Sequence, residues 1–155
     1  MPSQVPTSQR LAGIDYGTVR IGIAVTDAEQ RICSPFENYT RRGAKADAQH
    51  FEQFAREEQI ATFVVGLPVH LHGGESQKST EARAFGKWLH ELTSVPVVFF
   101  DERFTTSEAE QLLGQAELTK KKRKAKLDKL AAQIMLSAFM ESRRHGDDNL
   151  RGLDE

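Results

Sequence analysis

The spacing of apolar residues divides the chain into a first part of short runs and a later part with helical periodicity. Three short apolar runs separated by turn residues come first: Leu11 to Tyr16, Ile21 to Thr26 and Ile32 to Tyr39. Runs of this length and composition are typical of β-strands. Because only short turns separate them, they predict an antiparallel meander.

Helical spacing begins after this meander. Phe51, Phe54 and Ala55 predict a helix over Ala46 to Glu58. A second helix is marked by Ala82, Phe85, Trp88, Leu89 and Leu92. A third begins with the capping-box spacing of Thr105 and Glu108. The last is marked by Leu127, Leu130, Ala131, Ile134 and Ala138.

Two apolar runs between the helices lack a polar face. Ala61 to Leu67 and Val95 to Phe100 are typical of strands buried on both sides. A glycine-containing loop, Pro68 to Gln77, follows the first of them. Because helices connect these later strands, we expect parallel, right-handed crossovers. The predicted fold class is therefore α/β.

Composition fits one domain without a membrane span. The chain has 155 residues, of which 39% are hydrophobic and 28% charged. No apolar run approaches the ~18 residues of a membrane helix, and the polar N-terminus is not a signal peptide. The lone Cys33 fits a reducing cytoplasm and is more typical of a packed residue than of a nucleophile. We expect disordered or polar tails over residues 1–9 and 143–155.

A cluster of basic residues stands out in a chain whose net charge is only −1. It comprises Lys120, Lys121, Lys122, Arg123, Lys124, Lys126 and Lys129. Such a cluster indicates a local anionic target. A solvated lysine-rich loop explains the same run equally well.

Asp15 is the first of three acids in unusual positions. It lies in a strand between Ile14 and Tyr16, where an ionised carboxylate needs a cation or several hydrogen-bond donors. A functional role is favoured. The structural alternative is that Asp15 accepts hydrogen bonds from the turn amides or pairs with Arg20.

Glu102 is the second acid, at the carboxyl end of a predicted parallel strand, where ligands of α/β sheets gather. Asp101 and Glu102 should point to opposite faces, so only one of them shares a site with Asp15. The other is expected to pair with Arg103 or to help cap the next helix.

Asp128 is the third acid. Helix geometry places it about 60° from the centre of the last helix's apolar stripe. The neighbouring Ala131 and Ala132 would let this side of the helix approach another element closely. The alternative is an acid near a helix N-terminus that interacts with the helix dipole.

Three converging carboxylates favour a hard divalent ion, Mg²⁺ or Mn²⁺. With a phosphate as a further ligand, one or two such ions would serve phosphodiester cleavage. The basic run beside Asp128 would then hold a nucleic-acid backbone.

Four motifs occur in order: GIDYGTVRIGIAVTD, VVGLP with a glycine loop, VVFFDERFTTSEAE and KKRKAKLDKLAAQIML. Together they resemble the YqgF/RuvX-type family of Holliday junction resolvases and ribosomal-RNA precursor nucleases. The resemblance covers residues 10–142. It implies a ribonuclease H-like domain with a mixed five-stranded sheet, three antiparallel strands then two parallel, flanked by helices.

The resemblance also implies an activity and a site. Asp15, Glu102 and Asp128 become the metal-binding and catalytic acids of an endonuclease in which metal-activated water attacks phosphorus. The expected role is 5′-end processing of pre-16S rRNA during ribosome biogenesis, with a ribosome-associated context. The alternative is cleavage of four-way DNA junctions in recombination, for which a homodimer is expected. Resolvases often carry a second acid three residues after the last one, where this chain has Ala131.

Substrate contacts are expected around these acids. They are Gly17, Thr18, Arg20, Arg103, Lys121, Lys122, Arg123 and Lys124. Gly17 would let the backbone approach a phosphate, and Arg103 would stabilise developing charge. Thr105 and Thr106 are equally consistent with helix caps, and His70 and His72 favour a substrate-contacting or solvated loop over a metal site.

Two other classes of function fit parts of the pattern. DYGT followed by a hairpin resembles the phosphate-binding turn of sugar kinases and chaperone ATPases, but that fold needs a second lobe. A non-catalytic nucleic-acid-binding module is the other alternative. The sequence does not decide between RNA and DNA.

Overall fold

A computed structural model describes residues 5–68, 76–104 and 120–145, and for residues 120–129 it describes the backbone alone. The strands are β1 (Arg10–Asp15), β2 (Arg20–Thr26), β3 (Cys33–Thr40), β4 (Ile60–Leu67) and β5 (Val97–Asp101). The helices are α1 (Ala44–Glu57), α2 (Gln77–Thr93), the short 3-10 helix η1 (Glu102–Phe104) and α4 (Lys120–His145).

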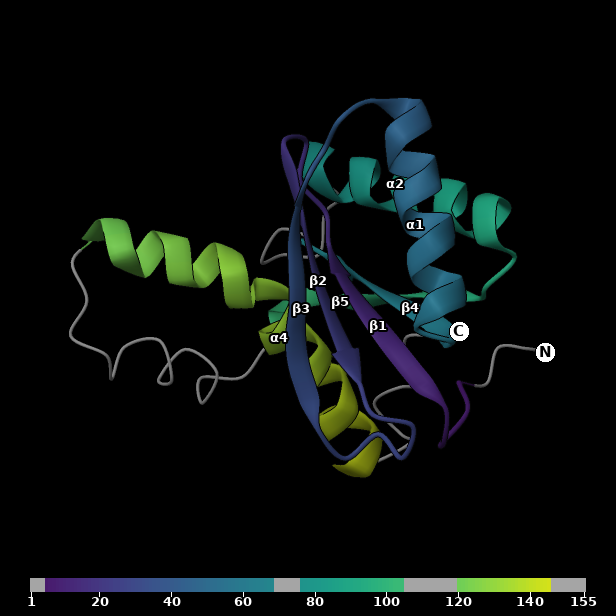
Figure 1. Ribbon diagram of the computed structural model, residues 1–155. Coiled ribbons are helices and arrows are strands. Elements are labelled where there is room, and N and C mark those ends of the chain that lie inside the picture. The colour runs from purple at the N-terminus through teal and green to yellow at the C-terminus, as the bar shows by residue number, and fades with distance from the viewer. Residues whose placement is uncertain (1–4, 69–75, 105–119, 146–155) are drawn as a thin grey trace.

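The strands form one mixed sheet in the order β3-β2-β1-β4-β5. β1 pairs antiparallel with β2, and β2 pairs antiparallel with β3. β1 and β5 each pair parallel with β4. The predicted α/β fold, with a meander followed by parallel strands, is therefore confirmed (Figure 1).

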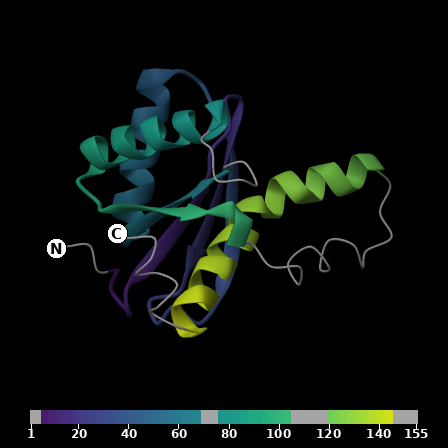
Figure 2. The ribbon, with the colours of Figure 1, turned by 180° about the vertical axis from the view of Figure 1, so that it is seen from behind.

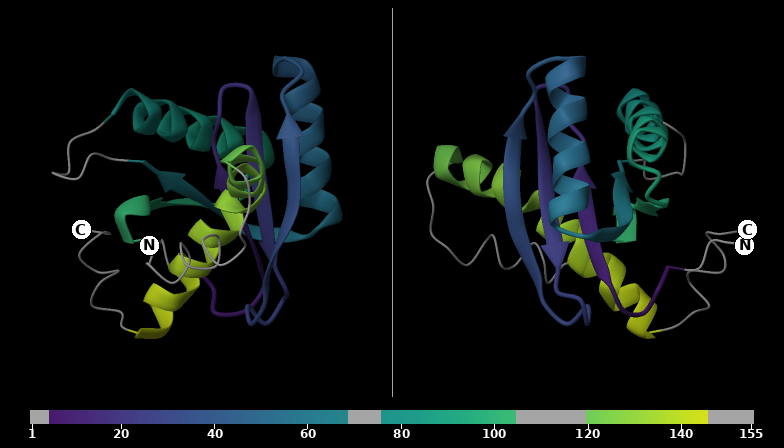
Figure 3. Two further views of the ribbon diagram at one scale, coloured as in Figure 1. Left: turned by 90° about the vertical axis from the view of Figure 1, so that its left-hand side faces the viewer. Right: turned by 45° about the vertical axis from the view of Figure 1, so that its right-hand side comes forward.

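Helices cover both faces of this sheet, with α1 and α4 on opposite sides (Figure 3). The strands alternate accordingly, because successive side chains point to opposite faces. Ala12 and Ile14 of β1 pack in the core beneath α1 and α2, whereas Leu11 packs beneath α4. Phe51 meets Phe85 and Trp88 edge-on in the first core, so Trp88 is a packing residue.

Helix α4 packs on one face of the sheet (Figure 2). It approaches the sheet closely at Gly13. A Cβ atom at Gly13 would lie 2.9 Å from Leu136 Cβ and 3.2 Å from the Ala132 carbonyl oxygen. Ala132 is buried in this contact. The expected close approach of the small-residue side of the last helix is therefore found at Ala132.

Helices α2 and α4 begin well before their first marked apolar residues. Helix α4 begins at Lys120, so the basic run is helical rather than part of a loop. Lysine and arginine are good helix formers, but a search for helical spacing of apolar residues does not detect them. Helix α2 begins at Gln77, well before Ala82, because Ser76 and Ser79 form a capping box.

The segment before β1 is fastened to the domain. Arg143 of α4 donates to the Val5 carbonyl oxygen at 2.7 Å, and Gln30 donates to the Pro6 carbonyl oxygen at 2.9 Å. The Gln9 amide donates to the Ala28 carbonyl oxygen. Residues 5–9, which were expected to be disordered, thus make defined hydrogen bonds, and α4 continues three residues past the expected boundary at 142.

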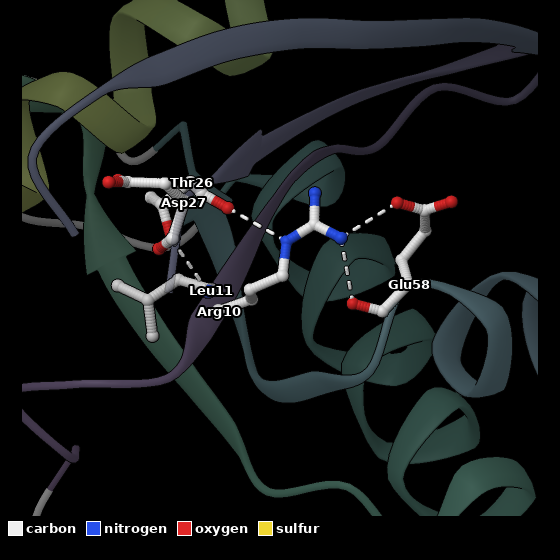
Figure 4. Close-up of polar contacts among 5 residues, drawn as sticks. All are labelled: Arg10, Leu11, Thr26, Asp27 and Glu58. Atoms are coloured by element: carbon white, nitrogen blue, oxygen red, sulfur yellow. Dashed lines mark hydrogen bonds and ion pairs between the residues drawn. The ribbon is translucent and has the colours of Figure 1, made fainter. Parts of the chain in front are cut away.

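Arg10 fixes the start of β1 between two other elements (Figure 4). Its guanidinium donates to the Thr26 carbonyl oxygen at 3.0 Å and to the Glu58 carboxylate at 2.8 Å. The Leu11 amide donates to Thr26 Oγ1 at 2.9 Å. These bonds set the position of β1 and therefore of Asp15 at its other end.

Among the described helices, none is long and apolar enough to cross a membrane.

Candidate functional site

Asp15 ends the central strand β1 and lines a pocket of about 240 Å³. The described residues that line this pocket, called here the Asp15 pocket, are Asp15, Tyr16, Gly17, Thr18, Val19, Arg20, Gly22, Asn38 and Lys78. Four of the predicted site residues are therefore together: Asp15, Gly17, Thr18 and Arg20.

The turn between β1 and β2 requires its glycine. A Cβ atom at Gly17 would overlap the carbonyl oxygen of Arg20. The glycine was interpreted as allowing a phosphate to approach, and the tight turn is a second, structural reason for it. Val19, at the tip of this turn, is 60% exposed.

Glu102 lies directly after β5, beside Gly66 of β4. A Cβ atom at Gly66 would lie 2.8 Å from Glu102 Oε1. The pKa of Glu102 is raised to about 7, chiefly by burial and next by the negative charge of Asp15, while the ammonium group of Lys78 acts in the opposite direction. Asp15 and Glu102 are therefore electrostatic neighbours at the carboxyl edge of the parallel strands.

Asp101 has a different partner, as its opposite orientation predicted. Its carboxylate accepts hydrogen bonds from the Arg103 side chain, at 2.9 Å from Nε and 2.5 Å from Nη2. The Arg103 backbone amide also donates to it. Burial alone would raise the pKa of Asp101, but these Arg103 interactions outweigh burial and the pKa lies below its ordinary value. The Arg103 guanidinium is thereby held by Asp101, and Arg103 is not among the described residues that line the Asp15 pocket.

Asp128 lies in the helical backbone of α4, and its side chain is outside the described residues. The helix runs opposite to β1, since Arg143 reaches Val5 before the strand while Ala132 lies against Gly13. Residue 128 is one turn, about 6 Å, before Ala132 in the direction of the Asp15 end. The first turns of α4 extend past β3 (Figure 1).

The remaining predicted positions are only partly described. Lys121, Lys122, Arg123 and Lys124 lie in the first turns of α4 with undescribed side chains. His70, His72, Thr105 and Thr106 lie outside the described residues. Among the side chains that are described, no group of three or more His, Cys, Asp or Glu residues is arranged to hold a metal ion.

Lys78 and Asn38 were not identified from the sequence. Lys78 was missed because the segment before it was interpreted as a loop up to Gln77. The signal for the helix start was the pair Ser76 and Ser79, whose side chains and backbone amides bond reciprocally at 3.0 Å and 2.9 Å. Asn38 lies on β3 opposite Gly22, and only strand register could have placed it there.

A buried carboxylate braces the turn after Asp15. Asp47 accepts hydrogen bonds from Tyr39 Oη at 2.6 Å and from Arg41 Nε at 3.1 Å. Arg41 also donates to Tyr16 Oη at 3.0 Å. This chain of contacts holds Tyr16, the residue next to Asp15, against α1.

Cys33 is unsuited to nucleophilic chemistry. Burial raises the pKa of its thiol to about 11, so the thiolate is scarce at neutral pH. Its Sγ contacts the Gln133 carbonyl oxygen of α4 at 3.6 Å. The packing role expected for this residue agrees with these contacts.

The raised pKa of Glu102 predicts a pH dependence of stability in metal-free protein. The folded state keeps the Glu102 proton up to about pH 7, whereas the ordinary pKa of a glutamate side chain is 4.5. Folded protein therefore binds more protons in this interval, and the free energy of unfolding falls as pH rises through it. Relative to Glu102→Gln, wild-type protein should lose up to about 3 kcal/mol between pH 4.5 and 7.5.

Urea unfolding at several pH values, with chelator present, measures this difference. Saturating Mg²⁺ should reverse the trend, because a bound cation favours the ionised carboxylate. Curves for wild type and Glu102→Gln that run parallel over the whole interval would contradict the assignment.

The two described acids suit a hard divalent cation. Carboxylate oxygens are ligands that Mg²⁺ and Mn²⁺ prefer. Burial and the charge of Asp15 both disfavour the ionised form of Glu102, and a bound cation would favour it. Asp15 and Glu102 could therefore hold such an ion, with hydrogen-bonding groups of the Asp15 pocket beside it.

Comparisons with known proteins give one consistent result. Residues 9–142 match the RuvX family, described as "Holliday junction resolvase". A Rhodopirellula baltica protein named "Putative pre-16S rRNA nuclease" is 47% identical over 140 residues, covering 90% of this chain and 81% of that protein. A Rhizobium meliloti protein of the same name is 38% identical over 141 residues, covering 91% and 86%.

A solved structure shows the fold. The RuvC protein of Thermus thermophilus superposes with a TM-score of 0.53 at 14% identity, covering 86% of this chain and 96% of that one. The fold is the ribonuclease H-like α/β fold that the motifs implied.

Proposed function

This chain belongs to the RuvX family, and from that premise we propose that it is a divalent-metal-dependent endonuclease that hydrolyses phosphodiester bonds. The observation that carries the proposal is the meeting of Asp15 and Glu102 at the carboxyl edge of the parallel strands. The pKa of Glu102 is raised chiefly by burial and next by the charge of Asp15, and a bound cation would favour the ionised form of both carboxylates.

The metal site would consist of Asp15, Glu102 and Asp128. The direction of α4 supports Asp128 as the third ligand. Ala132 lies against Gly13 and Arg143 against Val5, so residues that precede Ala132 lie toward the Asp15 end of β1. One or two Mg²⁺ or Mn²⁺ ions bound there would supply an activated water and charge stabilisation at phosphorus. The chain's own contribution is to hold the carboxylates on a rigid sheet edge and to orient the substrate.

Substrate contacts would come from the Asp15 pocket and from the basic run. Thr18 offers a hydroxyl and Arg20 a guanidinium within the pocket. Arg103, oriented by Asp101, is suited to developing phosphate charge. Lys121, Lys122, Arg123 and Lys124 would bind the nucleic-acid backbone along the first turns of α4.

The proposed substrate is the precursor of 16S rRNA, cleaved at its 5′ end in the cytoplasm. The name and high identity of the Rhodopirellula baltica relative support this choice. A four-way DNA junction is the second candidate, supported by the description of the family itself. The second substrate calls for a homodimer, because two strands of a junction are cut symmetrically.

A substrate panel tests the proposal. Purified protein is incubated with labelled pre-16S RNA, four-way DNA junctions, duplex DNA and single-stranded RNA, with Mg²⁺, with Mn²⁺ or with chelator. We expect metal-dependent cleavage of the precursor RNA, and no cleavage with chelator. Cleavage confined to the junction would favour the second candidate. Salt-sensitive binding without cleavage of any substrate would favour a binding module.

A further inference from the structure

Lys78 brings a second positive charge to the Asp15 pocket. It lies in the first turn of α2 and lines the pocket together with Asp15 and Arg20. Among the described lining residues, Lys78 alone comes from outside the first three strands and the turn between β1 and β2. The cations of the pocket thus come from two elements, Arg20 from β2 and Lys78 from α2.

The backbone that carries Lys78 is firmly held. Ser76 Oγ accepts a hydrogen bond from the Ser79 amide at 3.0 Å and donates one to the Pro68 carbonyl oxygen at 2.8 Å. Ser79 is inaccessible to solvent and closes the capping box. Since Pro68 directly follows β4, these bonds fix the start of α2 over the same sheet edge as Glu102. Lys78 itself is exposed, so its ammonium group is accessible to a ligand.

The surrounding charges show what this ammonium group can bind. Without metal, Lys78 partly compensates Glu102, whose pKa it lowers. Once a divalent ion neutralises Asp15 and Glu102, this attraction weakens, and an incoming phosphate oxygen is the stronger partner. The pocket also offers the Thr18 hydroxyl and the Asn38 amide, groups that commonly bind phosphate and sugar oxygens.

We propose that Lys78 is a substrate-binding residue, which contacts a phosphodiester of the nucleic acid that enters the Asp15 pocket opposite Arg20. The inference rests on the proposed function, because it takes the substrate to be a nucleic acid. It adds a contact from α2 to those expected from β1, β2 and α4. It further implies that the phosphate backbone passes between the amino end of α2 and the β1–β2 turn.

Two matched variants on one helix test the inference. Lys78→Met removes the proposed contact, and Lys87→Met removes an equally exposed lysine that lies in a separate groove beside Phe99. Binding of fluorescent precursor RNA is measured from 50 to 200 mM salt with Ca²⁺ in place of Mg²⁺, so that a divalent ion is present, and a gel checks that the RNA stays uncut. Kd rises as the salt concentration increases from 50 to 200 mM. Loss of one phosphate contact should make this rise about threefold smaller. Lys78→Met should show this smaller salt dependence and a higher KM for cleavage with Mg²⁺. Lys78→Arg should restore the wild-type salt dependence and KM. Lys87→Met should resemble wild type.

The outcomes separate the inference from the proposed function. If wild type cleaves but Lys78→Met keeps the wild-type salt slope and KM, the inference is wrong and the function stands. If Lys78→Met changes only the Mg²⁺ requirement or the pH profile, Lys78 serves the carboxylates, and the inference is also wrong. If wild type binds RNA with a slope that depends on Lys78 but never cleaves, the contact is supported and the nuclease proposal fails.

Discussion

Replacing Asp15 with asparagine should lower metal-dependent cleavage by about 10³-fold, corresponding to about 4 kcal/mol of lost transition-state stabilisation. The substitution keeps the size of the side chain but removes the charge that would attract a divalent ion. It also removes the repulsion that raises the pKa of Glu102. Thermal stability of the metal-free variant should therefore equal or exceed that of wild type.

Initial cleavage rates at saturating Mg²⁺, together with thermal unfolding, measure the effect. Glu52→Gln serves as the matched control, because it neutralises an exposed acid on α1 without touching the Asp15 pocket. We expect the control to cleave like wild type. Cleavage by Asp15→Asn at the wild-type rate would remove Asp15 from the mechanism and leave the metal site without its central ligand.

The second large effect concerns two glycines on neighbouring strands. Gly66→Ala should reduce cleavage by about 10²-fold with a smaller loss of stability, because the new methyl group meets the far ends of two flexible side chains, Glu102 and Met135, and displaces the Glu102 carboxylate. Gly13→Ala should instead destabilise the protein by about 1–3 kcal/mol. Its methyl group meets Leu136 Cβ and the Ala132 carbonyl oxygen, which belong to the packed part of α4.

Chemical denaturation and cleavage assays on both variants separate the two roles. The cleavage rate of each variant is divided by the wild-type rate at a temperature where both proteins are folded. This ratio isolates the displacement of Glu102 from any loss of stability. Restored activity in Gly66→Ala with a larger ion such as Mn²⁺ would agree with a widened site. Full activity in Gly66→Ala would show that the Glu102 carboxylate need not occupy its present position.

The sequence predicted the sheet and the acid pair for physical reasons that the structure bears out. Apolar runs without a polar face identified β4 and β5, because a parallel strand is buried on both sides. The alternation of side chains then separated the roles of Asp101 and Glu102. The meeting of Asp15 with Glu102 followed from the general position of ligands at the carboxyl ends of strands.

Other features depended on contacts that periodicity does not encode. The start of α2, and with it Lys78, was set by two serines rather than by apolar spacing. The start of α4 lies in a run of helix-forming lysines that carries no apolar spacing. No apolar spacing marks Asp47 of α1, yet this residue is 1% exposed, and its carboxylate bonds to Tyr39 and Arg41 through tertiary packing.

The position of β1 has a consequence for the order in which the site comes into being. This strand is the first to leave the ribosome, yet it occupies the middle of the sheet and receives β4 as a neighbour only later. A nascent chain that exposes only the meander carries Asp15 without Glu102 or α4. If the three acids form the metal site, a partly synthesised chain lacks some of its ligands and cannot cleave nucleic acid. Activity then begins only after the last helix has been translated.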